Sequence, residues 1–154
     1  MNKNVYAQNF SLIKELAPEM IMDSQPDYYL EHRGRIDPDV ITYVRRNAKN
    51  CITLGTFWPM NGDRLRDPCF EVMFDCDRHL ARVQAFDTEN IGILHLLGVG
   101  EAIYDHYECT FDTLENEREK FANEYLRDWL LDIVEEIEND KEFFQHIVIG
   151  EKPC

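Results

Sequence analysis

Apolar residues recur at helical spacing near the start of the chain. The pattern falls in residues 6–20, and Pro18 marks the end region of the predicted helix. Its apolar face consists of Phe10, Leu12, Ile13, Leu16 and Ala17. We therefore expect an N-terminal helix that buries this face.

A second and longer helical pattern follows from about Asp112. Asp112 or Thr113 can cap this helix, and three acidic residues, Glu115, Glu117 and Glu119, lie near the positive end of its dipole. Its broad apolar face consists of Phe121, Ala122, Tyr125, Leu126, Trp129, Leu130, Ile133, Val134 and Ile137. Exposed large apolar residues could form a patch for self-association, and the candidates are Trp58, Trp129, Phe143 and Phe144. For Trp129 we prefer packing in the core.

Between the two helical patterns lie short runs rich in β-branched and aromatic residues. Residues 50–58, 69–75 and 80–87 are predicted strands, with a tight connection at residues 76–79. Residues 39–46 favour a fourth strand, although a helix opened by Asp37-Pro38 is an alternative.

Two further segments lie outside these helices and strands. The stretch PMNGDRLRDP is predicted as a loop, because two prolines bracket it and Asn61-Gly62 can take positive φ. The C-terminal stretch FFQHIVIGEKPC could add an edge strand or dock on the core.

The expected fold class is α+β in a single domain, residues 1–154. We predict an antiparallel three- to four-stranded meander packed against an N-terminal helix and a long acidic C-terminal helix. With 154 residues and 44% hydrophobic content, the chain can bury a core without disulfides or metal. No signal peptide or membrane-spanning run is evident, and five cysteines is an odd number, so we expect a cytoplasmic protein with reduced thiols, in a bacterium or in the host of a phage.

The charge of the chain is unevenly distributed. The formal net charge is −14, and residues 101–154 account for −11 of it, with sixteen acidic and five basic residues. A field of this sign repels nucleic acid and anionic membranes and attracts basic surfaces. Direct nucleic-acid or membrane binding is therefore not expected.

Carboxylates recur at every fourth position of the second helical pattern. The row consists of Glu124, Asp128, Asp132, Glu136 and Asp140, and Glu117, Glu135 and Glu138 broaden it. Like charges four residues apart repel, at roughly 1–2 kcal/mol for the whole row. Four residues of helix rise about 6 Å, which is close to the spacing of phosphates along a nucleic-acid strand. The row predicts a surface for a basic partner, although many such rows only keep a helix solvated.

Four stretches resemble the YqiB-like family of uncharacterised bacterial proteins. NFSLIKELAP resembles its N-terminal helix signature, CITLGTFW and FEVMFDCDRHLARVQAF resemble its central strands, and NEYLRDWLLDIV resembles its closing helix, with Tyr125 where phenylalanine is usual. The stretch MNGDRLRDP departs from that pattern, and its NGD and DP resemble a second uncharacterised family of bacteria and mobile elements. The resemblance implies the fold and a bacterial or phage setting, and it names no catalytic residue.

Cysteine and histidine pairs suggest a metal site. Cys76 and His79 form a C-x2-H pair, and His106 and Cys109 form an H-x2-C pair. Two such ligands from each of two turns are what tetrahedral zinc uses. Ordinary buried cysteines and surface histidines are the simpler interpretation, so zinc is the alternative and no cofactor is the main expectation.

Acidic residues also crowd the predicted loop and the strand after it. Asn61, Gly62, Asp63 and Asp67 make this the loop of interest, and Glu71, Asp75 and Asp77 follow it. Paired carboxylates can hold a divalent cation or act as acid and base. Turn chemistry is the simpler interpretation, in which Asp63 and Asp67 bond to their own backbone and Pro68 stiffens the exit from the loop.

The sequence thus predicts a non-enzymatic interaction protein. Its partner-binding residues are Glu124, Asp128, Asp132, Glu135, Glu136 and Asp140. An inhibitor of a nucleic-acid-binding defence enzyme, of the anti-CRISPR or anti-restriction type, would present such a nucleic-acid-mimicking helix. The alternatives are a metal-dependent enzyme or zinc-stabilised domain, and a housekeeping protein that binds a small molecule between sheet and helices.

Overall fold

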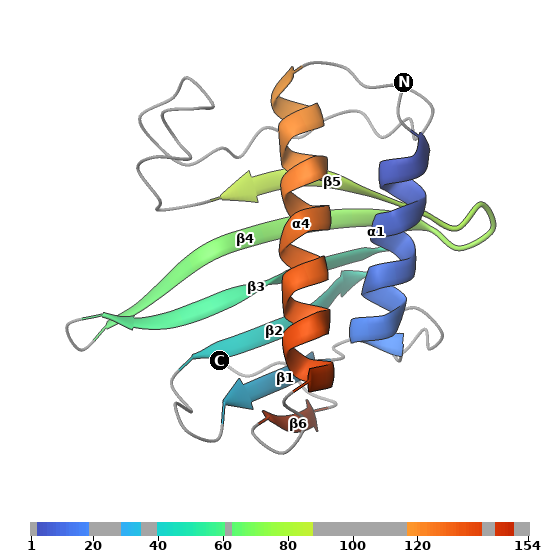
Figure 1. The fold of residues 1–154 in the computed structure, drawn as a ribbon. Coiled ribbons are helices and arrows are strands. Elements are labelled where there is room, and N and C mark those ends of the chain that lie inside the picture. Colours follow the sequence, from blue (N-terminus) through green and yellow to red (C-terminus); the bar gives the residue numbers. More distant parts are fainter. Residues whose placement is uncertain are drawn as a thin grey trace.

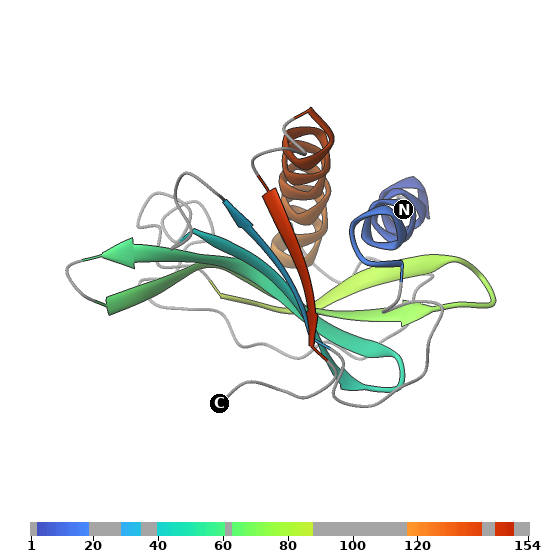
Figure 2. The ribbon, with the colours of Figure 1, turned by 90° about the horizontal axis from the view of Figure 1, so that it is seen from below.

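Six antiparallel strands form one sheet, and two helices cover one of its faces (Figures 1 and 2). The computed structural model describes residues 3–18, 29–34, 40–60, 63–87, 117–139 and 144–149. In chain order the elements are α1 (Lys3–Leu16), β1 (Tyr29–Gly34), β2 (Ile41–Ala48), β3 (Cys51–Met60), β4 (Asp63–Asp75), β5 (Leu80–Asp87), α4 (Glu117–Asn139) and β6 (Phe144–Ile149). The strands lie in the order β5-β4-β3-β2-β1-β6.

The core lies between the helices and the sheet. Alternate residues of the central strands contribute to it, and Ile52 pairs with Val72 and Leu54 with Phe70 in the register of β3 and β4. The predicted apolar faces are buried: Phe10, Ile13 and Leu16 from α1 with Ala17 just after it, and Ala122, Leu126, Leu130 and Val134 from α4. Trp129 packs against this core, 5.6 Å from the ring of Phe70, as preferred from the sequence.

The two helices run side by side in the same direction (Figure 1). Early residues of α1 contact early residues of α4: the Tyr6 hydroxyl donates to Glu119 and the Asn9 amide donates to the Asn123 carbonyl at 3.1 Å. Near the C-terminal ends, Glu15 contacts Glu138. The negative ends of both helix dipoles therefore lie at the same end of the molecule.

A buried ion pair joins the sheet to α4. Arg82 of β5 and Glu119 of α4 are both fully buried and form a salt bridge. The hydroxyl of Tyr6 donates to the same carboxylate at 3.5 Å, so α1 takes part as well. Because an unpaired charge in this place would be very unfavourable, the three elements are fixed relative to one another.

Asn123 continues the same polar network. Its side-chain oxygen accepts the N–H of Val83 at 2.9 Å, and its amide nitrogen donates to the Glu119 carbonyl at 2.9 Å. Val83 lies beside an irregularity in β5, where Val72 pairs with Val83 and Glu71 pairs with Ala85. Asn123 therefore satisfies a backbone donor on the outermost strand of the described sheet.

Most of the predicted elements are confirmed. The α+β class, both helices, the strands at residues 39–46, 50–58, 69–75 and 80–87, and the turn at residues 76–79 are all present. The sheet is larger than the predicted three to four strands. β6 comes from the C-terminal stretch and pairs with β1, so the edge-strand reading of that stretch is confirmed.

The predicted loop at residues 59–68 is wrong in extent. β3 continues to Met60 and β4 begins at Asp63, with Pro59 paired opposite Arg64. Pro68 lies at the bulge where the register shifts between Gly55 and Phe57, a position at which a strand tolerates proline. A Cβ on Gly55 would collide with the Pro68 carbonyl oxygen, so the glycine makes this close approach feasible. Asn61 and Gly62 lie outside the described residues.

We predict that removing one partner of the buried ion pair is far more harmful than removing both. Glu119→Leu alone should lower the free energy of unfolding by roughly 3–5 kcal/mol, because it leaves the Arg82 charge buried. The double variant with Arg82→Met should recover much of that loss. Urea unfolding measures both, with Glu135→Leu at an exposed position of α4 as the matched control. A Glu119→Leu variant as stable as the control would contradict this role.

Candidate functional site: the acidic face of α4

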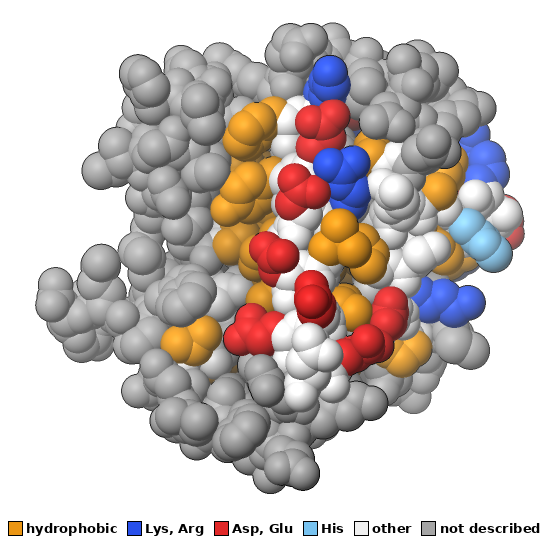
Figure 3. Space-filling model, viewed as in Figure 1, with side chains coloured by type: hydrophobic (Ala, Val, Ile, Leu, Met, Phe, Trp, Pro, Cys, Tyr) orange, Lys and Arg blue, Asp and Glu red, His pale blue; other side chains and the backbone are white. Residues whose placement is uncertain are grey.

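The predicted partner-binding residues lie along the exposed side of α4. Four of them, Asp128, Asp132, Glu135 and Glu136, are exposed, and Glu124 is half-buried. Asp140 lies outside the described residues. Figure 3 shows acidic side chains following one another along this helix. The row is therefore available to a partner over the part of the helix that is described.

Basic residues on α4 are confined to its N-terminal two-thirds. Arg127 forms an ion pair with Asp128 at 3.0 Å. Lys120, which is exposed, lies about two helical turns before Arg127. The last turn of α4 contains no basic residue. Carboxylates near a helix C-terminus are unfavourable, because they face the negative end of the dipole. The carboxylates near the C-terminus of α4 therefore lie where the helix dipole stabilises them least.

The C-terminal end of α1 adds to this field. Glu15 of α1 and Glu138 of α4 lie close enough for a hydrogen bond between their carboxyl groups, and this contact raises the pKa of Glu15, with burial and the Glu138 charge as further causes. A small cavity of about 60 Å³ lies beside them and is lined in part by the buried His32. The His32 Nε2 is 3.4 Å from the Leu16 carbonyl oxygen, to which it donates. Two parallel helices therefore end together in a group of acids.

The predicted metal pair Cys76 and His79 lies in the turn between β4 and β5. Both residues are exposed, and the His79 ring stacks on Phe10 at 5.1 Å between ring centres. Partial burial raises the pKa of the Cys76 thiol, as do the charges of Asp75 and Asp77. The other pair, His106 and Cys109, lies outside the described residues. Within the described ranges, no group of three or more His, Cys, Asp or Glu side chains could hold a metal ion.

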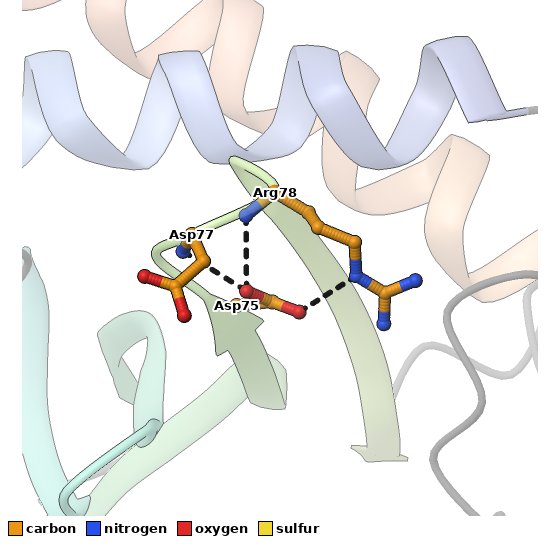
Figure 4. Close-up of polar contacts among 3 residues, drawn as sticks. All are labelled: Asp75, Asp77 and Arg78. Atoms are coloured by element: carbon orange, nitrogen blue, oxygen red, sulfur yellow. Dashed lines mark hydrogen bonds and ion pairs between the residues drawn. The ribbon is translucent and has the colours of Figure 1, made fainter.

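The aspartates of this turn have structural partners. Figure 4 shows the Asp75 carboxylate accepting the backbone N–H groups of Asp77 and Arg78, at 2.9 and 3.0 Å, and pairing with the Arg78 guanidinium at 2.8 Å. The hydrogen bond from the Arg78 side chain, followed by the backbone bonds, lowers the pKa of Asp75. Asp75 therefore stabilises its own turn, whereas the turn chemistry expected from the sequence concerned Asp63 and Asp67, whose side chains lie outside the description. His79 completes the turn with a φ of 57°.

The remaining acidic residues of the predicted carboxylate cluster are spread along β4. Asp63 and Asp67 belong to the strand, and their side chains lie outside the description. Glu71 accepts hydrogen bonds from Cys51 at 3.6 Å and from Gln84 at 3.3 Å, both on neighbouring strands. Glu71 and Asp75 therefore have separate partners, as in a cross-strand polar network.

The sequence did not reveal which residues of α1 border the acidic face. Ala7, Gln8, Ser11 and Leu12 line a groove between the helices, opposite Arg127 and Leu131. Leu131 keeps 48% of its surface exposed. No pattern within one helix indicates which residues of another helix will lie beside it, so only the structure brings these two segments together.

Comparison of the chain with protein-family models, curated proteins and solved structures gave no match. The resemblance to the YqiB-like family therefore stays a prediction. In the part of the chain that the structure describes, no helix combines the length and apolar character needed to cross a membrane.

We predict that Glu138→Gln stabilises the protein at neutral pH and makes its stability less dependent on pH. The raised pKa of Glu15 means that the folded protein holds this proton to higher pH than the unfolded chain does. Protonated Glu15 therefore stabilises the folded state at pH values below its ordinary pKa of 4.5. This stabilisation is lost as the pH rises through the raised pKa that Glu15 has in the folded protein. Removing the Glu138 charge should raise the free energy of unfolding at neutral pH by about 0.3–1 kcal/mol at low salt.

Urea unfolding at neutral pH and at a pH near 4.5 measures this effect, with Glu135→Gln as the control on the same helix. The control removes one exposed carboxylate without removing the contact to Glu15. Equal pH profiles for the two variants would show that the contact between Glu15 and Glu138 has no energetic weight.

Proposed function

We propose that this protein is a non-enzymatic interaction protein that binds a basic protein surface through the acidic face of α4. The observation that carries the proposal is the gathering of exposed carboxylates toward the shared C-terminal end of α1 and α4, where α4 has no basic residue in its last turn. This arrangement works against helix stability. Solubility alone requires no such segregation, whereas recognition of a basic partner does.

The spacing of the row supports a partner surface that otherwise binds nucleic acid. Asp128, Asp132 and Glu136 follow one another with a rise of about 6 Å per step. At 3.6 residues per turn the row also drifts about 40° around the helix at each step, so it twists slowly as a nucleic-acid strand does. An inhibitor of a nucleic-acid-binding defence enzyme, of the anti-CRISPR or anti-restriction type, is the specific role that fits this description.

The alternative is a metal-dependent enzyme or zinc-stabilised domain that uses Cys76, His79, His106 and Cys109. His106 and Cys109 lie outside the described residues. Elemental analysis of protein purified without added metal distinguishes the two: stoichiometric zinc would favour the alternative.

We predict that Asp128→Asn, Asp132→Asn and Glu136→Gln together weaken binding to a basic surface by about tenfold or more, since each charge contact contributes a few tenths to one kcal/mol. A fluorescent oligo-arginine peptide serves as the basic probe, and anisotropy titrations at several salt concentrations give the affinity and its salt dependence.

The matched control changes the net charge equally at other exposed sites. The control combines Ala48→Lys at the exposed end of β2, Asn50→Lys in the following turn and Asp77→Asn in the turn between β4 and β5, and it leaves α4 intact. If the control weakened binding as much as the α4 variant, attraction would depend on net charge alone, and the proposed surface would be wrong.

A further inference from the structure

The groove between α1 and α4 is an apolar channel beside the acidic row. It has a volume of about 400 Å³. Its α1 wall contains Ala7 and Ser11, and its α4 wall contains Arg127 and Leu131. On each wall these residues are four apart, so the channel runs along the helix axes. The two small side chains of α1 leave room for a side chain from outside.

Leu131 gives the channel an apolar rim. It is the large hydrophobic residue that remains exposed in the described part of the chain, at 48%. Single exposed leucines are common on protein surfaces, and this one matters because it lies on the rim of the groove. The neighbouring Arg127 is paired with Asp128, so its charge is partly offset at the edge of the groove.

Charge decides which occupant fits. Exposed carboxylates lie near the channel on both helices. By helical spacing Glu15 continues the α1 wall beyond Ser11 and Glu135 continues the α4 wall beyond Leu131, and Asp128 is adjacent to Arg127. A second copy of this chain would bring its own acidic row toward the first, and an anionic membrane would be repelled in the same way. A partner with basic residues on both sides of an apolar stripe matches the groove and its borders.

We propose that this groove takes the apolar face of a basic amphipathic helix from a partner protein. A large apolar side chain of that helix enters the channel beside Leu131, and its lysines or arginines face the acids on either side. The partner helix runs antiparallel to α1 and α4, so that its positive N-terminal end lies over the acidic C-terminal ends of both helices. This inference rests on the proposed function and adds to it the form of the ligand.

The test uses two peptides of about five helical turns with identical composition. One arranges leucines and lysines to form an apolar stripe, and the other scrambles them so that no stripe forms. The wild-type protein should bind the striped peptide about tenfold more tightly, because burial of one leucine-sized side chain suffices for that difference. Anisotropy titration of each labelled peptide gives the ratio.

Variants separate the groove from the charges. Ser11→Trp should fill the channel without changing charge and should abolish the preference for the striped peptide, while affinity for the scrambled peptide stays unchanged. Leu131→Ala should reduce the preference in the same direction, and circular dichroism checks that both variants are folded. The triple variant at Asp128, Asp132 and Glu136 should lower the affinity for both peptides by the same factor.

The outcomes distinguish the two proposals. Equal affinity of the wild type for both peptides would contradict helix binding in the groove and leave the charge-based function untouched. A preference for the striped peptide that survives both Ser11→Trp and Leu131→Ala would have the same meaning. If the triple variant bound both peptides as tightly as the wild type, the proposed function itself would fail. Both proposals are supported if Ser11→Trp removes the preference for the striped peptide while binding still depends on the charges of α4.

Discussion

The buried pair of Arg82 and Glu119 is the constraint on which the arrangement of the molecule depends. Two full charges without solvent exposure are tolerated only when they meet each other and find further polar partners. Tyr6 supplies such a partner from α1, so one carboxylate fixes the sheet and both helices together. Hydrophobic burial alone would allow a helix to slide along a sheet, whereas this pair permits one position.

The direction of the two helices follows from that anchor. With Tyr6 next to Glu119 and Asn9 next to Asn123, α1 and α4 start together, run parallel and finish together. Antiparallel neighbours would cancel their dipoles, whereas parallel neighbours add them. The acidic C-terminal group is therefore a result of the same geometry that the buried pair fixes, and the groove beside it lies between the two aligned helices.

Local patterns were sufficient for the elements and insufficient for their assembly. Phe10, Ile13 and Leu16 are spaced at helical intervals, and Leu54 and Phe70 lie in runs rich in β-branched and aromatic residues, so both helices and the meander could be predicted. Glu119 was placed near a helix start, as its position in the sequence suggests, but its partner Arg82 is 37 positions away in the chain. The extent of β4 was underestimated because Pro68 is usually a strand breaker, and the bulge that accommodates it depends on Gly55 of another strand. The acids of α4 were visible in the sequence, whereas Glu15 beside Glu138 depends on how two distant helices pack.

The pairing of β1 with β6 has a consequence for how the chain folds. β6 lies more than a hundred positions after β1, and α4 meets α1 across a similar distance along the chain. The hairpins from β1 to β5 form from nearby residues, but the helix α4, which covers part of their apolar face, comes later in the chain. During synthesis the meander must therefore wait, with its apolar face uncovered by α4, until the residues of α4 have left the ribosome. Such distant contacts slow folding through the entropy of loop closure, so late closure of the first segment onto the last is the expected rate-limiting event.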